Sequence, residues 1–115
     1  MAIVNQQLTT TQLDMITVPA SKSYAITNIL VCNNGTAAAS FDMHLIPQSS
    51  SLSNTVTRVI NNLELPAGET FTFDSEKIVL EVGDKISFVA EPQSTEPAAV
   101  VGNTCLAATV SYLEV

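Results

Sequence analysis

Apolar side chains recur at every second position of this chain, and this alternation limits the fold more than any other feature. The clearest example is segment 40–46, in which Phe41, Met43 and Leu45 alternate with polar residues. Successive side chains of a β-strand point to opposite faces of its sheet, so the pattern predicts a strand with one buried face. Similar short segments, separated by turn residues, follow along the chain, and none reads as a helix of useful length.

The sequence therefore predicts an all-β fold: a single antiparallel β-sandwich of about eight strands, with jelly-roll and immunoglobulin-like strand orders both left open. A length of 115 residues fits one domain with its own core. We expect residues 1–11 to form an N-terminal arm or an edge strand, and residues 12–115 to form the sandwich. Apolar or alternating segments place the strands at 3–8, 13–18, 24–32, 38–46, 55–65, 70–73, 77–81, 85–90 and 105–115.

Turn residues separate these segments. Asn33-Asn34-Gly35 predicts a tight hairpin between the strands before and after it, because Asn-Gly suits turn positions with positive φ. Pro19-Ala20-Ser21-Lys22 and Pro66-Ala67-Gly68-Glu69 are two similar proline-led turns. Val82-Gly83-Asp84 predicts a further tight turn, and Asn61-Asn62 a bend within the strand expected at 55–65.

The charge balance argues against several classes of partner. The net charge is −7, and the four basic residues are scattered along the chain. Nucleic-acid binding normally needs clustered Lys and Arg, and an acidic chain is repelled by DNA and by anionic membranes. Only 13% of the residues are charged, against about 25% in an average soluble domain. A surface of this kind is common in proteins that pack into assemblies, and it is also seen in secreted β-domains.

The N-terminal residues lack the positively charged start and apolar stretch of a signal peptide. We therefore expect synthesis and folding in a cytoplasm, where Cys32 and Cys105 stay reduced. A Cys32–Cys105 disulfide is the alternative if their strands adjoin.

The sequence contains few residues that suggest a catalytic or metal-binding site. Its one histidine, His44, shares a predicted polar strand face with Asp42, but no serine or cysteine stands in a nucleophile motif. We interpret His44 as a surface histidine without a catalytic role. The acidic residues near turns, such as Asp84, read as solvating groups and not as calcium ligands. The sequence thus predicts no enzyme activity, no catalytic residues, no metal and no cofactor.

Two segments are candidate contact surfaces. One is the start of the chain, which could add a strand to a neighbouring sheet edge. The other is an apolar stretch inside a proline-broken loop, although it could equally pack over its own core. The candidate partner contacts are Ile3, Val4, Ala98, Ala99, Val100 and Val101.

Several turn motifs resemble those of a known family. Residues 17–22 read Thr-Val-Pro-Ala-Ser-Lys, and residues 29–38 form an apolar strand, a Cys-Asn-Asn-Gly turn and small residues. Leu-Pro-Ala-Gly-Glu-Thr at 65–70 and Val-Gly-Asp-Lys-Ile at 82–86 follow. Together these motifs resemble small bacteriophage virion structural proteins of the capsid decoration, or cement, type. The chain departs from the family pattern at Ser21, where Gly is usual, and in the proline-broken loop.

The resemblance implies a structural virion protein that binds and stabilises a capsid lattice. It implies the major capsid protein or other virion proteins as partners, self-association, and a location in the virion. A neck, tail or fibre subunit is the alternative within the same class. A carbohydrate- or receptor-binding β-sandwich module is the rival from another class. Neither direct nucleic-acid binding nor membrane binding is expected.

Overall fold

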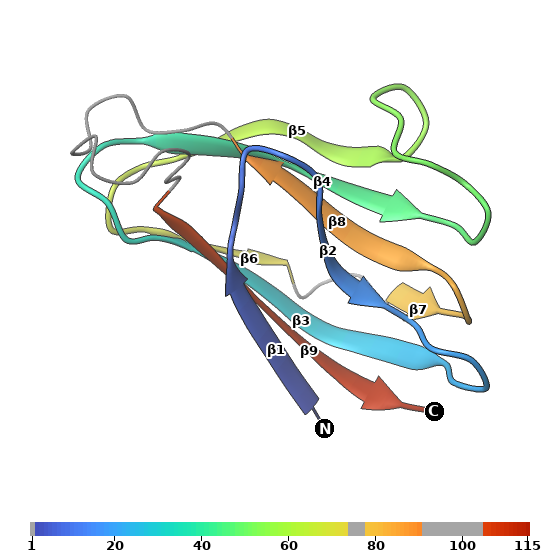
Figure 1. Ribbon diagram of the computed structural model, residues 1–115. Coiled ribbons are helices and arrows are strands. Elements are labelled where there is room, and N and C mark those ends of the chain that lie inside the picture. The colour runs from blue at the N-terminus through green and yellow to red at the C-terminus, as the bar shows by residue number, and fades with distance from the viewer. Residues whose placement is uncertain (1, 74–77, 91–104) are drawn as a thin grey trace.

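The chain folds into two antiparallel sheets that pack face to face (Figure 1). The computed structural model describes residues 2–73, 78–90 and 105–115. Within these residues it contains nine strands and no helix, which confirms the predicted β-sandwich. The strands are β1 (Ala2–Gln7), β2 (Leu13–Thr17), β3 (Tyr24–Asn33), β4 (Ala39–Ile46), β5 (Arg58–Leu65), β6 (Thr70–Phe73), β7 (Ile78–Leu80), β8 (Lys85–Ala90) and β9 (Leu106–Glu114).

The strand order gives the topology that the sequence left open. Sheet A has the order β1-β9-β3-β6, with β7 also paired to β3, and sheet B has the order β2-β8-β4-β5. Successive strands therefore pass between the sheets at most connections, and the first and last strands are neighbours. With β6 and β7 counted as two parts of one strand along β3, this is the jelly-roll arrangement of eight strands.

The core lies between the sheets and is made by alternate residues of each strand. Ile29, Val31 and Val110 of sheet A face Phe41 and Phe88 of sheet B, and all five are almost fully buried. The predicted alternation in β4 holds for Phe41 and Met43. Residues between two buried positions of a strand, such as Leu30 between Ile29 and Val31, point away from the core. These residues form the outer faces of the two sheets.

The predicted hairpin at Asn33-Asn34-Gly35 is wrong. β3 belongs to sheet A and β4 to sheet B, so this turn carries the chain across the sandwich and does not pair its flanking strands. The fully buried Asn33 side chain holds the crossing in place. Its Nδ2 donates to the carbonyls of Ala37 and Leu65, both at 2.9 Å, and its Oδ1 accepts from the Gly35 N–H at 2.9 Å. An Asx turn therefore forms where a two-residue hairpin was expected.

The two proline-led turns adopt a shared conformation. Ser21 has φ 67° and Gly68, at the matching position, has φ 78°. The left-handed region suits Gly and strains Ser, so Ser21 carries a conformational cost that Gly68 avoids. The bend expected in β5 is also present: its register with β4 shifts near Asn62, which has φ 51°. β5 begins at Arg58 and not at Thr55, because residues 54–57 form a turn.

Candidate interaction surface

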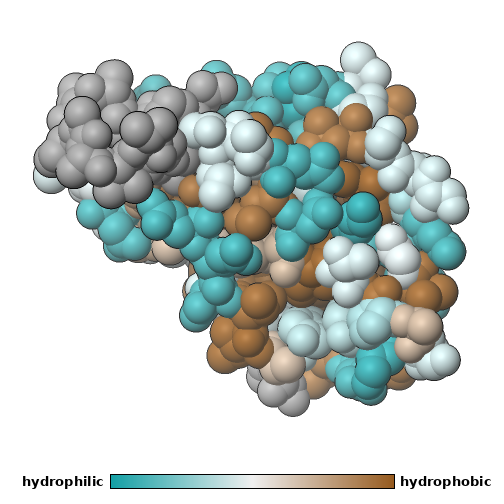
Figure 2. All heavy atoms as spheres, in the orientation of Figure 1, coloured by the Kyte–Doolittle hydropathy of each residue, from teal (hydrophilic) through white to brown (hydrophobic). Residues whose placement is uncertain are grey.

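The two candidate contact residues near the N-terminus lie on β1, which forms one edge of sheet A. β1 pairs with β9 without a break, from Ala2 opposite Tyr112 to Gln7 opposite Ala107. Ile3 is 67% exposed on the outer face, whereas Val4 is half-buried and packs against the core. Figure 2 shows hydrophobic surface in the lower part of the molecule, where β1 lies. The other four candidates, at 98–101, fall outside the described residues.

The outer face of sheet A carries no charged side chain among the described strand residues, with β9 counted as far as Leu113. Register places its residues in rows across the sheet, for example Asn5, Thr109 and Leu30. Small polar and aliphatic side chains make up this face, and none is aromatic. We call it the uncharged face; it consists of Ile3, Asn5, Gln7, Ala25, Thr27, Asn28, Leu30, Cys32, Thr70, Thr72, Val79, Ala107, Thr109, Ser111 and Leu113.

Charges gather elsewhere on the described part of the molecule. Sheet B carries two ion pairs, with Arg58 Nη1 at 3.6 Å from Asp42 Oδ2 and Lys85 Nζ at 3.8 Å from Asp14 Oδ2. Lys22 and Glu114 form a third pair, at 2.6 Å, at the end of sheet A where β3 begins and β9 ends. The remaining described charges lie on β5 or in turns: Glu64, Glu69, Glu81 and Asp84. The two faces of the sandwich therefore differ in their electrostatic character.

The prediction that His44 lies on the surface is wrong. Its side chain is fully buried, because the turn before β5 folds back over the outer side of β4. His44 Nδ1 lies 2.8 Å from Thr57 Oγ1. Thr57 Oγ1 donates its own proton to the Ser53 carbonyl at 2.9 Å, so Nδ1 must be the donor to Thr57. Nε2 then carries a lone pair, and no partner for it lies among the described residues.

These polar groups do not form a nucleophile and base pair. Ser87 is the cross-strand neighbour of His44, but its hydroxyl is buried and donates to Asp14 Oδ1 at 2.6 Å. That hydrogen bond is the main reason that the pKa of Asp14 is lowered. Desolvation lowers the pKa of His44, because burial disfavours the imidazolium. Asp14, Ser87 and His44 therefore form a row of polar side chains across β2, β8 and β4.

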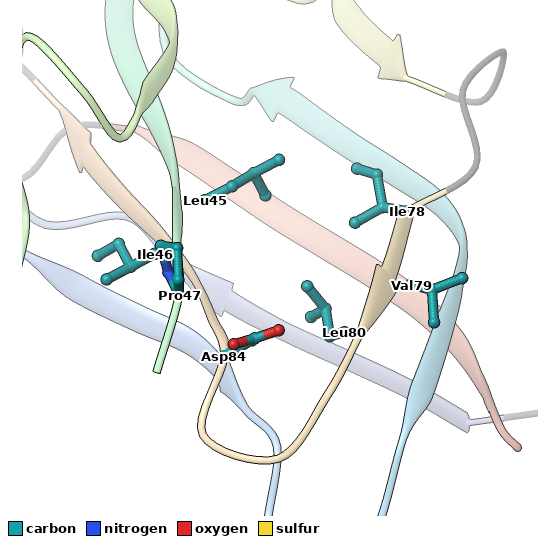
Figure 3. Close-up of a pocket in the computed structure, with 7 residues that line it drawn as sticks. All are labelled: Leu45, Ile46, Pro47, Ile78, Val79, Leu80 and Asp84. Atoms are coloured by element: carbon teal, nitrogen blue, oxygen red, sulfur yellow. The ribbon is translucent and has the colours of Figure 1, made fainter. Parts of the chain in front are cut away.

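A shallow apolar groove opens between the end of β4 and β7, with a volume of about 200 Å³ (Figure 3). Leu45 and Ile46 line one side and Ile78 and Leu80 the other, as the figure shows. Asp84 closes one end, but its carboxylate already accepts from the backbone N–H groups of Gln48 and Glu81. The groove therefore offers contact area for an apolar group and few polar groups to orient a ligand.

Other kinds of site find little support in the part of the chain that the structure describes. No group of three or more His, Cys, Asp or Glu residues comes together there as metal ligands. The same residues include no helix long and apolar enough to cross a membrane. Cys32 and Cys105 are not bonded to each other.

The sequence reasoning missed the uncharged face, although part of its signal is visible. Positions 107, 109, 111 and 113 of β9 alternate with buried residues and contain no charge, and the same holds for Leu30 and Cys32 in β3. What the sequence does not reveal is that β1, β9 and β3 are neighbours, which brings these separate stripes together.

Comparison with known proteins gives no relative. No family model matches the chain, and neither a curated protein nor a solved structure matches it.

Proposed function

We propose that this chain is a structural protein of a bacteriophage virion, which binds the capsid lattice and stabilises it as a decoration, or cement, protein. The observation that carries the proposal is the uncharged face of sheet A. We assign this face to the contact with the major capsid protein. The turn motifs at 17–22, 29–38, 65–70 and 82–86 supply the virion context.

The physical argument concerns desolvation. Burying a charge at an interface is costly unless a partner charge meets it, and interface cores are depleted in charged residues for this reason. Ala, Thr and Ser side chains on a sheet leave a flat surface that another protein can cover at little cost. Each copy can bind weakly, because many copies on a symmetric shell act together.

The fold is compatible with this role, and it also occurs in other roles. Jelly rolls occur in viral capsid proteins and in lectins, so the fold alone does not decide between the two. Sugar binding usually relies on aromatic side chains. The uncharged face has none, and Tyr24 and Tyr112 stack on each other at 4.3 Å on the inner side of sheet A. A virion role is therefore better supported than a carbohydrate-binding role.

The test is cosedimentation of the purified protein with empty shells assembled from the major capsid protein of the same virus. We expect saturable binding of the unmodified chain. Thr109→Lys, which places a charge in the centre of the uncharged face, should weaken that binding at least about tenfold, the scale of an unpaired charge in an interface.

Val59→Lys is the matched control, because Val59 is 51% exposed on β5 in the other sheet and the substitution adds the same charge. It should bind shells like the unmodified chain. Failure of the unmodified chain to bind, or equal binding by Thr109→Lys, would contradict the proposal. Saturation at only a few copies per particle would instead favour the neck, tail or fibre alternative.

A further inference from the structure

β1 is an edge strand without the usual protection against pairing. Natural edge strands are shortened, charged, bulged or interrupted by proline, because an open edge can pair with another chain. β1 has six residues, Ala2–Gln7, with no charge and no proline, and its register with β9 is unbroken.

The other edges of the sandwich are protected in ways that β1 is not. β2 carries Asp14, and its register with β8 shifts between Asp14 and Ile16. β5 carries Arg58 and Glu64, and its register with β4 shifts twice. β6 and β7, which share the remaining edge, have only four and three residues. Among the described strands, β1 is thus the one suited to pair with another chain.

Backbone geometry identifies the groups that β1 presents outward. Beyond Gln7, the Leu8 N–H donates to the Leu106 carbonyl at 2.8 Å, in line with the β1–β9 register. Antiparallel strands alternate the side to which successive residues turn their N–H and C=O groups. Val4 therefore turns these groups toward β9, as Leu8 does, whereas Ile3 and Asn5 turn theirs to the open edge.

We propose that β1 pairs antiparallel with β1 of a second copy of this chain, about a two-fold axis perpendicular to the sheet. The backbone groups of Ile3 in one copy bond those of Asn5 in the other, and Val4 meets Val4 at the axis. Such an axis keeps each residue on its own face, so the pairing joins sheet A of both copies into one sheet.

The symmetry of β1 favours a second copy as the partner: the outward backbone groups of Ile3 and Asn5 lie on either side of Val4, so each finds its complement in the same strand of another copy. Charge limits where the two copies can meet. The chain carries a net charge of −7, so two copies repel each other wherever their acidic surfaces approach. β1 and the neighbouring uncharged face are the part of sheet A where two copies can meet without opposing carboxylates. A single strand pair buries less area than a standard interface, so we expect a weak dimer, with a dissociation constant of about 10 μM to 1 mM. The inference does not depend on the capsid proposal.

The test is the average mass of the full chain by light scattering, up to about 1 mM so that it covers the expected affinity. We expect the mass to rise toward that of a dimer. Asn5→Pro removes an outward N–H and leaves the bonds to β9 in place, and edge strands tolerate proline at such positions. Ile3→Lys adds a charge to the edge. Both variants should weaken dimerisation at least about tenfold, whereas Val59→Lys should change it less than about twofold.

Amide hydrogen exchange in the unmodified chain gives a second readout that needs no substitution. The Ile3 and Asn5 amides should exchange slowly at high concentration and fast on dilution, whereas the Val4 amide should not respond. A mass that stays monomeric throughout would overturn the proposal. So would a dimer that both variants retain, or one in which the Ile3 and Asn5 amides remain unprotected.

Discussion

At the residue scale, Asn33 stabilises the turn that leads from β3 in sheet A to β4 in sheet B. Its side chain donates to the carbonyls of Ala37 and Leu65 and accepts from the Gly35 N–H. Asn33→Ala should lower the free energy of unfolding by about 2–3 kcal/mol, because the buried Leu65 carbonyl loses its donor. Urea denaturation measures this change.

Asn34 gives the control for that experiment, since it is the exposed neighbour of Asn33 in the same turn. Asn34→Ala should change the free energy of unfolding by less than about 0.5 kcal/mol. Equal losses in the two variants would mean that the turn sequence matters and the buried side chain does not.

His44 should make the fold sensitive to mild acid. Burial lowers its pKa in the folded state below the ordinary value of 6.5, so the unfolded chain binds the proton more readily. The stability that His44 contributes is therefore complete above pH 6.5 and is lost as the pH falls from there through the folded-state pKa. In the unmodified chain, the urea midpoint should be lower at pH 5 than at pH 7.5. His44→Gln should reduce that difference. An unchanged difference in His44→Gln would assign the acid sensitivity to other groups.

The sequence predicted the alternation of β4 and the inward position of Phe41 and Met43, because strand periodicity is a local property. It did not predict the burial of His44. The turn that covers His44 comes from residues 53–57 and reaches it only after the chain folds back. The Asn-Gly pair likewise favoured a hairpin, because turn preference depends on the local sequence. Whether β3 and β4 join the same sheet depends on how all the strands pack around the core, and they join different sheets.

At the element scale, the turn between β7 and β8 depends on Gly83. Gly83 has φ 84°, and a Cβ there would lie 2.6 Å from Gln48 Cγ. Gly68 has nearly the same φ, of 78°, but a Cβ there would meet nothing within 4 Å. Gly68→Ala should therefore cost about 1 kcal/mol from backbone strain alone, and Gly83→Ala about 2–3 kcal/mol because Gln48 must also move.

Thermal or urea unfolding of the two variants isolates the Gln48 contact as their difference. If both variants lose the same stability, Gln48 adjusts without cost and the backbone conformation accounts for the whole effect.

Most strands could be located from the sequence within one to three residues, because turn residues bound them clearly. Strand order could not, and the jelly-roll arrangement became visible only through pairings such as β1 with β9, whose members are about as far apart in the chain as two strands can be. The uncharged face depends on the same long-range pairing, so its stripes are readable in β3 and β9 separately but not as one surface.

At the scale of the whole molecule, the net charge of −7 opposes self-association and the uncharged β1 edge permits it. Salt screens the repulsion between two copies, so raising the salt from about 20 mM to about 500 mM should tighten the dimer. Sedimentation equilibrium at both salt concentrations measures this effect. Weaker association at high salt would indicate ion pairs between the copies, which β1 cannot supply.

The most direct test of the central claim asks which face the shell covers. Cys32 lies on the uncharged face and is half-buried, so its thiol serves as a native probe of that face. Alkylation of Cys32, followed by mass spectrometry, should slow at least about tenfold when the protein is bound to shells, because an interface core excludes solvent. A cysteine introduced on sheet B by Val59→Cys should react at the same rate in the free and the bound protein. Unchanged Cys32 labelling together with protection at position 59 would place the contact on the opposite sheet and contradict the account.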